Sequence, residues 1–322
     1  MDALNIIYAI MRESLIFAIP LLLVALGGMF SEKSGVVNIA LEGIMIVGAF
    51  CSIWSINIIQ DKYPTMNPSV LLLLAGVIAI IAGMIFSTLL AVSAINFKAD
   101  QTIGGTAINL LAPALVVYIA RAIQNVKNIQ FTANFAIQKV PLLGDIPALG
   151  DILFQKVNIM VYVGFVILML AWVVIYKTKF GLRLSACGEH PSAADSVGIN
   201  VYRIRWAGVI ISGALGGLGG LVFIVSSSVS FGGDVAGYGF LAIAVMIFGQ
   251  WKPEKILLAS LFFGLTKAFA YKYTLIPGLS SLNIGNFFKM LPYIATMVVL
   301  VFTSKKSRAP KAEGIPYDQG AR

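Results

Sequence analysis

Charged side chains are scarce in this sequence: only 11% of its 322 residues are Asp, Glu, Lys or Arg, whereas hydrophobic residues make up 59%. A soluble domain has about 25% charged residues. The composition, with a mean hydropathy of +0.91, therefore excludes a soluble globular protein and predicts an integral membrane protein. The net charge of +9 is then a topology signal rather than a nucleic-acid footprint, and no Arg-aromatic patch indicates a nucleic-acid partner.

The side chains that most enzymes and metal sites use are also nearly absent. The chain has two cysteines, Cys51 and Cys187, and one histidine, His190, and none of them has metal-ligand spacing. The sequence contains no Gly-x-x-x-x-Gly-Lys-Ser/Thr motif to cradle a nucleotide phosphate and no His-Glu-x-x-His motif. We therefore expect no metal, no disulfide, no cofactor and no catalysis by this chain alone.

Long uncharged segments dominate instead. A transmembrane helix needs about 20 apolar residues, and about nine segments approach or exceed that length. They cover residues 14–31, 34–60, 63–97, 101–120, 157–176, 206–233, 235–251, 256–271 and 290–304. The pattern predicts an all-α polytopic membrane protein of about nine transmembrane helices, with one transmembrane domain over residues 1–322.

The basic residues orient these spans, because Lys and Arg concentrate in cytoplasmic loops. If the polar segment 177–205 is cytoplasmic, most of the 23 Lys and Arg residues fall on that side, including those of the tail 304–322. The expected C-terminus is then cytoplasmic and the N-terminus external. Residues 1–13 have apolar positions at helical spacing, which predicts a short amphipathic helix on the outer membrane surface. An extension of the first span fits the same residues.

A polar segment at 186–205 interrupts the hydrophobic pattern. Pro191 suits the first turn of a helix, where its missing N–H costs nothing, and Gly198 suits the left-handed conformation that ends one. The residues between them supply about two helical turns. His190, directly before the proline, is a poorer helix cap than Asn. We predict a short, capped cytoplasmic helix that a partner protein contacts.

Small residues recur four apart within the segment 206–233, at Gly213/Gly217 and Gly216/Gly220. Such spacing allows two membrane helices to approach closely. The spacing is wrong for a dinucleotide-binding loop, so we interpret it as helix packing. The segment from Ser230 to Trp251 opens with glycines and Asp234, and predicts an irregular, bent start to the seventh span.

Few polar residues enter membrane depth, and these are candidates for a substrate path. Asn38 and Glu42 lie four apart, which predicts one shared helical face, and Thr106 and Asn109 share another. Two other interpretations stay open: Glu42 reaching cytoplasmic water, and the second pair bonding a neighbouring helix. For Lys267, inside the eighth span, we favour snorkelling to the outer surface over a position on a water-filled path.

Three stretches carry a resemblance to a transporter family. They are GGMFSEKSGVVNIALEGIMIVGAF (27–50), FGLRLSACGEHPSAADSVGINVYRIR (180–205) and GYGFLAIAVMIFGQWKPEKILLASLFFG (237–264). In order and spacing they resemble the inner-membrane permease subunits of ATP-binding-cassette importers, in the group that includes the ribose and branched-chain amino acid permeases. The forms SEKSGVVNIALEG and ADQTIGGTAINLLAPAL are most similar to the subfamily that imports nucleosides. The family commonly has Asn where this chain has His190.

The resemblance implies a type II importer permease that forms a path for nucleosides and couples to a separate ATPase. It implies that part of 177–205 contacts that ATPase. The matching positions are Arg183, Gly188, Glu189, Pro191, Ala194, Gly198 and Asn200. The implied partners are an ATP-binding cassette ATPase subunit, a second related permease chain in a heterodimer, and an extracellular substrate-binding lipoprotein, at a bacterial cytoplasmic membrane.

Two alternatives to a nucleoside importer remain. One is a permease for a sugar or a branched-chain amino acid in the same importer group. The other is an autonomous secondary carrier, which needs several intramembrane carboxylates or a histidine relay for ion coupling. Glu42 is the only carboxylate clearly within a predicted span, which disfavours the carrier.

Overall fold

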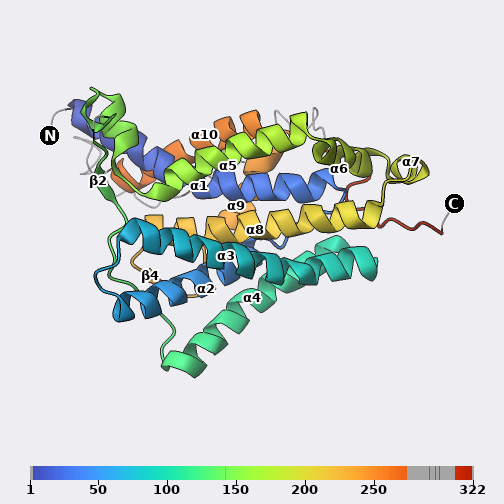
Figure 1. Ribbon diagram of the computed structural model, residues 1–322, viewed down its shortest axis with the longest axis horizontal. Coiled ribbons are helices and arrows are strands. Elements are labelled where there is room, and N and C mark those ends of the chain that lie inside the picture. Colours follow the sequence, from blue (N-terminus) through green and yellow to red (C-terminus); the bar gives the residue numbers. More distant parts are fainter. Residues whose placement is uncertain are drawn as a thin grey trace.

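The computed structural model describes residues 3–141, 143–273 and 309–320, and the single positions 290, 294 and 297. Its helices, in chain order, are α1 (Ala3–Lys33), α2 (Leu41–Lys62), α3 (Pro68–Ala91), α4 (Gln101–Gln124), α5 (Ile159–Lys177), α6 (Lys179–Glu189), α7 (Pro191–Ser196), α8 (Val201–Ser227), α9 (Tyr238–Phe248) and α10 (Pro253–Lys272). The long helices run lengthwise through the molecule. Helices α6 and α7 and the C-terminus lie at one end, called here the α7 end, and the N-terminus lies at the opposite end (Figure 1).

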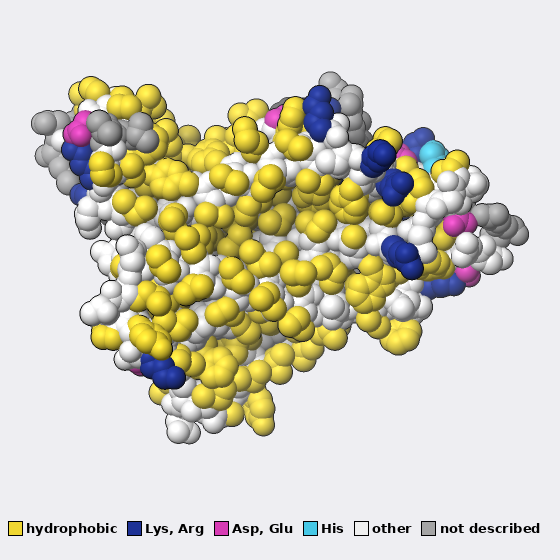
Figure 2. All heavy atoms as spheres, in the orientation of Figure 1, with side chains coloured by type: hydrophobic (Ala, Val, Ile, Leu, Met, Phe, Trp, Pro, Cys, Tyr) yellow, Lys and Arg dark blue, Asp and Glu magenta, His cyan; other side chains and the backbone are white. Residues whose placement is uncertain are grey.

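Six helices of the described residues are long and apolar enough to cross a membrane: α1, α2, α3 with the π-helical turn Val92–Asn96 that continues it, α4, α5 and α8. Hydrophobic side chains cover the middle of the face seen in Figure 2, and Lys and Arg side chains gather mainly near the α7 end. The chain is therefore a multi-pass, mostly helical membrane protein. The predicted count of about nine spans is not confirmed, and the last of them, 290–304, lies outside the described residues except at positions 290, 294 and 297.

Helix α8 lies at the centre and packs against α1, α2 and α3 (Figure 1). The glycines make this possible: a Cβ on Gly83 of α3 would lie 2.9 Å from the Gly217 Cα, and one on Gly216 would lie 3.0 Å from the Ile44 side chain of α2. A Cβ on Gly220 would overlap the Met45 carbonyl oxygen. The prediction that the glycines of this segment serve close helix packing is confirmed.

Helix α1 is continuous from Ala3 to Lys33. Residues 3–13 therefore extend the first span, which is the second of the two interpretations left open by the sequence. The separate surface helix predicted for residues 1–13 is wrong for the described residues 3–13.

The predicted second span is interrupted at its start. Gly35, with φ +95°, ends α1, and residues 36–40 are not helical before α2 begins at Leu41. Polar side chains satisfy this stretch of backbone: Ser31 Oγ donates to the Val36 oxygen (2.7 Å), and Gln101 Oε1 accepts from the Val37 N–H (2.7 Å). The predicted helix from residue 34 is therefore wrong for residues 36–40. The side chains of Ser31 and Gln101 replace the helical hydrogen bonds that this non-helical backbone lacks.

A second interruption precedes α9. The chain leaves α8 through a short strand, β4 (Ser230–Phe231), and α9 begins at Tyr238 after Gly237, whose φ is +74°. The predicted bent start is confirmed. The predicted full span over 235–251 is wrong, because α9 has 11 residues and is only about 16 Å long, half of a bilayer core.

Two short antiparallel ribbons add to the helices at the end opposite α7. Strand β1 (Ile129–Gln130) pairs with β4, and β2 (Ile137–Lys139) pairs with β3 (Gln155–Val157). The first attaches the long connection between α4 and α5 to the segment after α8, and the second pairs two parts of that connection with each other. The all-α prediction did not anticipate them, since strands of two or three residues have no detectable period-2 pattern.

Candidate functional site

The short helix predicted in the polar segment is present as α7. Pro191 is its first residue, and Gly198 beyond its end has φ +83°. The Gly198 N–H donates to the Asp195 oxygen (2.9 Å) and the Ile199 N–H to the Ala194 oxygen (3.1 Å), so the left-handed residue satisfies the last carbonyls. The His190 side chain makes no capping hydrogen bond, as expected of a poor cap.

The predicted partner-contact residues divide between two faces of this end. Four are exposed: Arg183, Glu189, Gly198 and Asn200. Pro191 is half-buried, and Gly188 and Ala194 are buried. The buried pair therefore faces the protein: a Cβ on Gly188 would overlap the Lys33 carbonyl oxygen at the end of α1. Asn200 caps α8, because its Oδ1 accepts from the Arg203 N–H (2.9 Å).

Two exposed apolar residues at this end were missed by the sequence analysis. Leu182 of α6 is 73% exposed and Val197 after α7 is 75% exposed. Both lie beside the exposed predicted contacts, outside the six candidate spans. The sequence could have indicated them, because each is an apolar residue on the polar side of an otherwise amphipathic segment. Exposed apolar residues of this kind often lie at the centre of protein–protein interfaces.

Glu42 binds the start of α9. Its Oε1 accepts from the Gly237 N–H (2.9 Å) and its Oε2 from the Gly239 N–H (2.6 Å), and the residue is only 9% exposed. A carboxylate at a helix N-terminus is stabilised by the unpaired N–H groups and the helix dipole. This carboxylate is therefore buried and bonded to the protein backbone rather than turned toward bulk water.

Asn38 and Glu42 do not share a helical face, because α2 begins only at Leu41. Asn38 instead donates from Nδ2 to Ser212 Oγ of α8 (2.8 Å). Its Oδ1 is buried and makes no hydrogen bond within the described part of the chain. That prediction was wrong in geometry, although both residues lie where the chain enters α2.

Asn109 of α4 also bonds to this segment. Its Oδ1 accepts from the Gly43 N–H (2.8 Å), and its Nδ2 donates to the Ile39 oxygen (2.7 Å). Asn38, Glu42 and Asn109 thus converge on the start of α2 and are called here the α2-start cluster. Thr106 stands apart: it is exposed and donates to the Thr102 oxygen in its own helix (2.7 Å).

Lys267 of α10 turns into the bundle. Its Nζ lies 5.1 Å from the ring centre of Tyr238, the first residue of α9. The favoured prediction that it snorkels to the outer surface is wrong, because an aromatic face close by offers the ammonium a cation–π contact.

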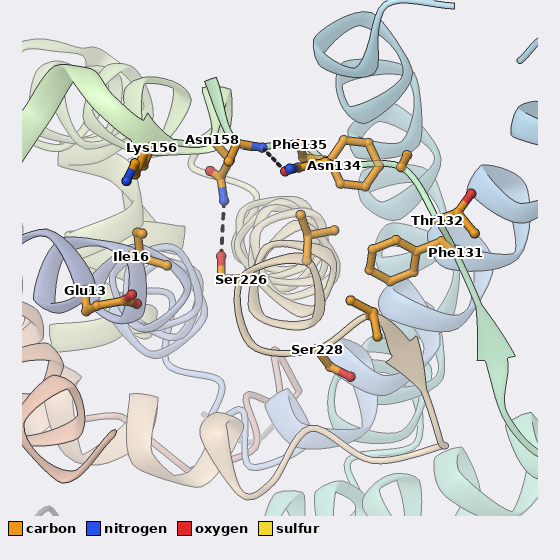
Figure 3. A pocket seen from close by; sticks show the side chains of 14 residues that line it. Glu13, Ile16, Phe131, Thr132, Asn134, Phe135, Lys156, Asn158, Ser226 and Ser228 are labelled. Atoms are coloured by element: carbon orange, nitrogen blue, oxygen red, sulfur yellow. Dashed lines mark hydrogen bonds between the residues drawn. The ribbon is translucent and has the colours of Figure 1, made fainter. Parts of the chain in front are cut away.

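A cavity of about 460 Å³ opens at the end opposite α7 (Figure 3). Its lining includes the rings of Phe131 and Phe135, whose centres are 5.8 Å apart, and the Asn158 amide, which donates to Ser226 Oγ (3.2 Å). Most polar lining groups are neutral amides and hydroxyls. No group of three His, Cys, Asp or Glu side chains among the described residues could hold a metal ion.

The molecule combines candidate membrane-crossing helices, two helix interruptions that meet at one buried carboxylate, and a small exposed helix at one end. Interrupted helices around a buried site are a feature of membrane transport proteins. The chain belongs to the family described as branched-chain amino acid transport system / permease component, whose model matches residues 10–301.

Curated relatives match the chain over nearly its whole length. It is 40% identical over 318 residues to the nucleoside ABC transporter permease protein NupC of Lactococcus lactis subsp. cremoris, covering 98% of this chain and 99% of the relative. It is 41% identical over 324 residues to the guanosine ABC transporter permease protein NupQ of Bacillus subtilis, covering 100% of both. A second Lactococcus permease, the nucleoside ABC transporter permease protein NupB, is 24% identical over 94% of this chain and 82% of its own length. No solved structure matches.

Proposed function

We propose that this chain is a transmembrane permease subunit of an ATP-driven importer for nucleosides. The observation that carries the proposal is the full-length similarity, at 40% and 41% identity, to permeases named for nucleoside and guanosine transport. In this proposal the chain binds no ATP, and hydrolysis takes place in a separate ATP-binding cassette subunit. A binding lipoprotein delivers substrate at the external end, in a bacterial cytoplasmic membrane.

A second, related permease chain completes the path in this proposal. The similarity to two different nucleoside permeases of one organism supports a heterodimer of permeases. Thr106, exposed on α4, would contribute to the path surface directly. The α2-start cluster would shape the wall behind it, since Asn109 and Glu42 bond the backbone at the starts of α2 and α9, and Asn38 bonds a side chain of α8.

In this proposal, the ATPase is coupled to the membrane helices through α7, because α8 follows α7 after only four residues. We assign the ATPase contact to Arg183, Glu189, Pro191, Gly198 and Asn200 at the α7 end, with Gly188 and Ala194 seating the same segment on the bundle. Nucleotide-driven closure of the ATPase pair would displace α7, and α8 begins a few residues later at Val201. Ser212, about 16 Å along α8, holds Asn38, so the displacement reaches the α2-start cluster.

The autonomous carrier fits the geometry less well. Ion coupling needs an intramembrane carboxylate that is free to exchange protons or ions with its surroundings. Both oxygens of Glu42 instead accept backbone hydrogen bonds, which makes this carboxylate a structural anion at a helix terminus.

Reconstitution of the chain with its partner permease and ATPase tests the function. We expect ATP-dependent accumulation of radiolabelled guanosine in proteoliposomes supplied with the binding lipoprotein, and none of ribose or leucine. Guanosine uptake that continues without the ATPase would establish the carrier. Uptake of leucine or ribose in place of guanosine would assign the chain to another substrate class of the group.

The proposed orientation has its own test. In a background with both cysteines replaced by serine, we expect a cysteine at Ser192 to react with a membrane-impermeant maleimide only from the cytoplasmic side. A cysteine at Asp145 should react only from outside. Both side chains are exposed, so in membranes that lack the ATPase their access depends on the side of the membrane alone. Labelling of the first from outside intact cells would reverse the orientation and remove the ATPase contact from α7.

A further inference from the structure

The described part of the C-terminal tail, residues 309–320, lies against the α7 end of the molecule. Backbone hydrogen bonds join it to two separate segments: the Ala312 N–H donates to the Gly188 oxygen (2.8 Å), and the Gly314 N–H donates to the Gly35 oxygen (3.2 Å). Arg205, which is only 1% exposed, donates from Nη1 to the Ile315 oxygen (3.0 Å). The tail therefore bridges α6, the start of α8 and the connection between α1 and α2.

Tyr317 is the apolar anchor of this tail. It is 7% exposed, and its ring centre lies 5.5 Å from that of Tyr202. It forms a small buried cluster, separate from the main core, with Cys187 of α6, Ala194 of α7 and Val201 of α8. One residue of the tail thus shares a buried cluster with a residue from each of the three helices of the segment that we assign to ATPase contact.

Polar contacts at the end of the tail extend this bridge. Asp318 Oδ2 lies 2.9 Å from Lys98 Nζ, in the connection between α3 and α4, and Gln319 Nε2 donates to the Asp195 carboxylate of α7 at 3.3 Å. Exposed pairs of this kind add little stability, so the buried contacts of Tyr317 and Arg205 hold the tail and these pairs extend its contacts to α7 and to the connection before α4. The Lys98 connection leads directly into Gln101, which binds the backbone before α2.

Helix α7 needs such external support. It has six residues, and Ala194 is its one buried residue. A helix this short is unstable by itself, since nucleation costs more than two turns of hydrogen bonds return. Its orientation therefore depends on the buried cluster that contains Ala194, and Tyr317 is a member of that cluster.

We propose that residues 309–320 act as a clasp that positions α7 for the ATPase, with Tyr317 as the positioning residue. The inference rests on the proposed ATPase contact of the α6–α7 segment and adds a transmission element to it. The clasp binds the α6–α7 segment at Gly188. It also binds the connection that leads into α2 at Gly35 and the connection that leads into α4 at Lys98, so it links α7 to both connections. A displacement of α7 then moves these connections together.

Cys187 is a built-in reporter of the clasp. Its side chain is fully buried in the Tyr317 cluster, and burial raises the pKa of its thiol to about 11. Since the thiolate is the reactive form, Cys187 should react slowly with maleimide at neutral pH while the clasp is closed. Opening the clasp exposes the thiol and lowers its pKa, so labelling should accelerate.

The test uses the full transporter complex in proteoliposomes with Cys51→Ser as background. For Tyr317→Ala we expect Cys187 labelling to accelerate about tenfold or more, while the ATPase still co-purifies. Guanosine imported per ATP hydrolysed should fall at least about fivefold, the lower end of common coupling effects. Tyr317→Phe, which keeps the ring, should restore both values. Ile315→Ala is the matched control, because its side chain is 57% exposed and its hydrogen bonds are made by backbone atoms alone.

Three other results would each contradict a different part of the proposal. Faster Cys187 labelling with unchanged import per ATP would overturn the positioning role, and unchanged labelling would overturn the clasp itself. A cysteine at Ser192 that fails to cross-link to the ATPase in the otherwise unaltered complex would overturn the ATPase contact of α7, independently of the tail. If Tyr317→Ala does not accumulate, Tyr317→Leu, which keeps apolar volume without the aromatic contacts, is measured by the same readouts with the same expected directions.

Discussion

Replacing Glu42 by leucine is expected to abolish uptake while the chain still inserts into the membrane. The substitution leaves the Gly237 and Gly239 N–H groups without the carboxylate that now binds them. Each unsatisfied buried group costs about 1–3 kcal/mol, and α9 also loses the anion at its positive end. A distortion of 2 kcal/mol corresponds to about a 30-fold loss. Radiolabelled guanosine uptake beside membrane abundance of the chain measures this effect.

A glutamine at position 42 has the same shape as the native glutamate but no charge, so it tests the two properties separately. Glu42→Gln keeps one acceptor oxygen for the start of α9 but loses the charge and the second bond, so an intermediate loss of uptake is expected. If Glu42 borders the path itself, the pH dependence of uptake should change as well in this variant. Normal uptake in both Glu42 variants would show that the carboxylate is dispensable and that α9 is held in place without it.

Variants of Asn109 and Thr106 distinguish residues that face the substrate from residues that only position the helices around the path. Asn109→Leu removes one hydrogen bond to the segment before α2 and one to the first turn of α2. It should weaken uptake through the position of this part of the chain, with the ATPase still bound. Thr106→Val changes an exposed side chain that bonds only its own helix, so it should alter the KM for guanosine alone if Thr106 faces substrate. These two variants provide the comparison for Glu42.

Local features of the fold were accessible from the sequence. Pro191 and Gly198 mark the ends of α7 because proline and glycine have restricted or unusual backbone preferences that act at single positions. The packing role of Gly213 and Gly217 follows from spacing alone. Both depend on residues within one segment, which the sequence displays directly.

The interrupted helices were accessible only in part: the glycines before α9 predicted its bent start, but not the length of the helix or the partner that holds the bend. Hydrophobic run length counts residues 235–251 as a span, although only the part from Tyr238 is helical. The break is stabilised by Glu42, a partner 195 residues away along the chain, and no local pattern indicates that pairing. The same holds for Val37, whose partner Gln101 lies on another helix.

The tail shows the same limit. Its basic residues predicted a cytoplasmic location, but its docked position depends on Gly188, Tyr202 and Arg205, which are more than 100 residues away along the chain. Polar composition in a terminal segment usually indicates a solvated chain. One aromatic residue, Tyr317, was the available signal of docking.

Replacing Gly198 by valine is expected to uncouple the transporter without disturbing its spans. Gly198 has φ +83°, and a Cβ built there would have no atom within 4 Å, so a substitution acts through backbone conformation alone. A β-branched residue in this left-handed conformation costs about 1–2 kcal/mol or more. Helix α7 is too short to absorb that cost, so the hydrogen bond from Ile199 to Ala194 should be lost and the exposed contact surface should change shape.

Asparagine provides the matched variant, because it tolerates the left-handed conformation that valine resists. We expect substrate-stimulated ATP hydrolysis of the reconstituted complex to be lost with Gly198→Val and retained with Gly198→Asn, with equal melting temperatures for the two purified chains. Loss in both variants would indicate that the ATPase needs the bare glycine surface rather than the turn. Undiminished stimulation with valine would mean that α7 does not transmit the ATPase movement, and the displacement would then have to reach α8 by another contact at this end of the molecule.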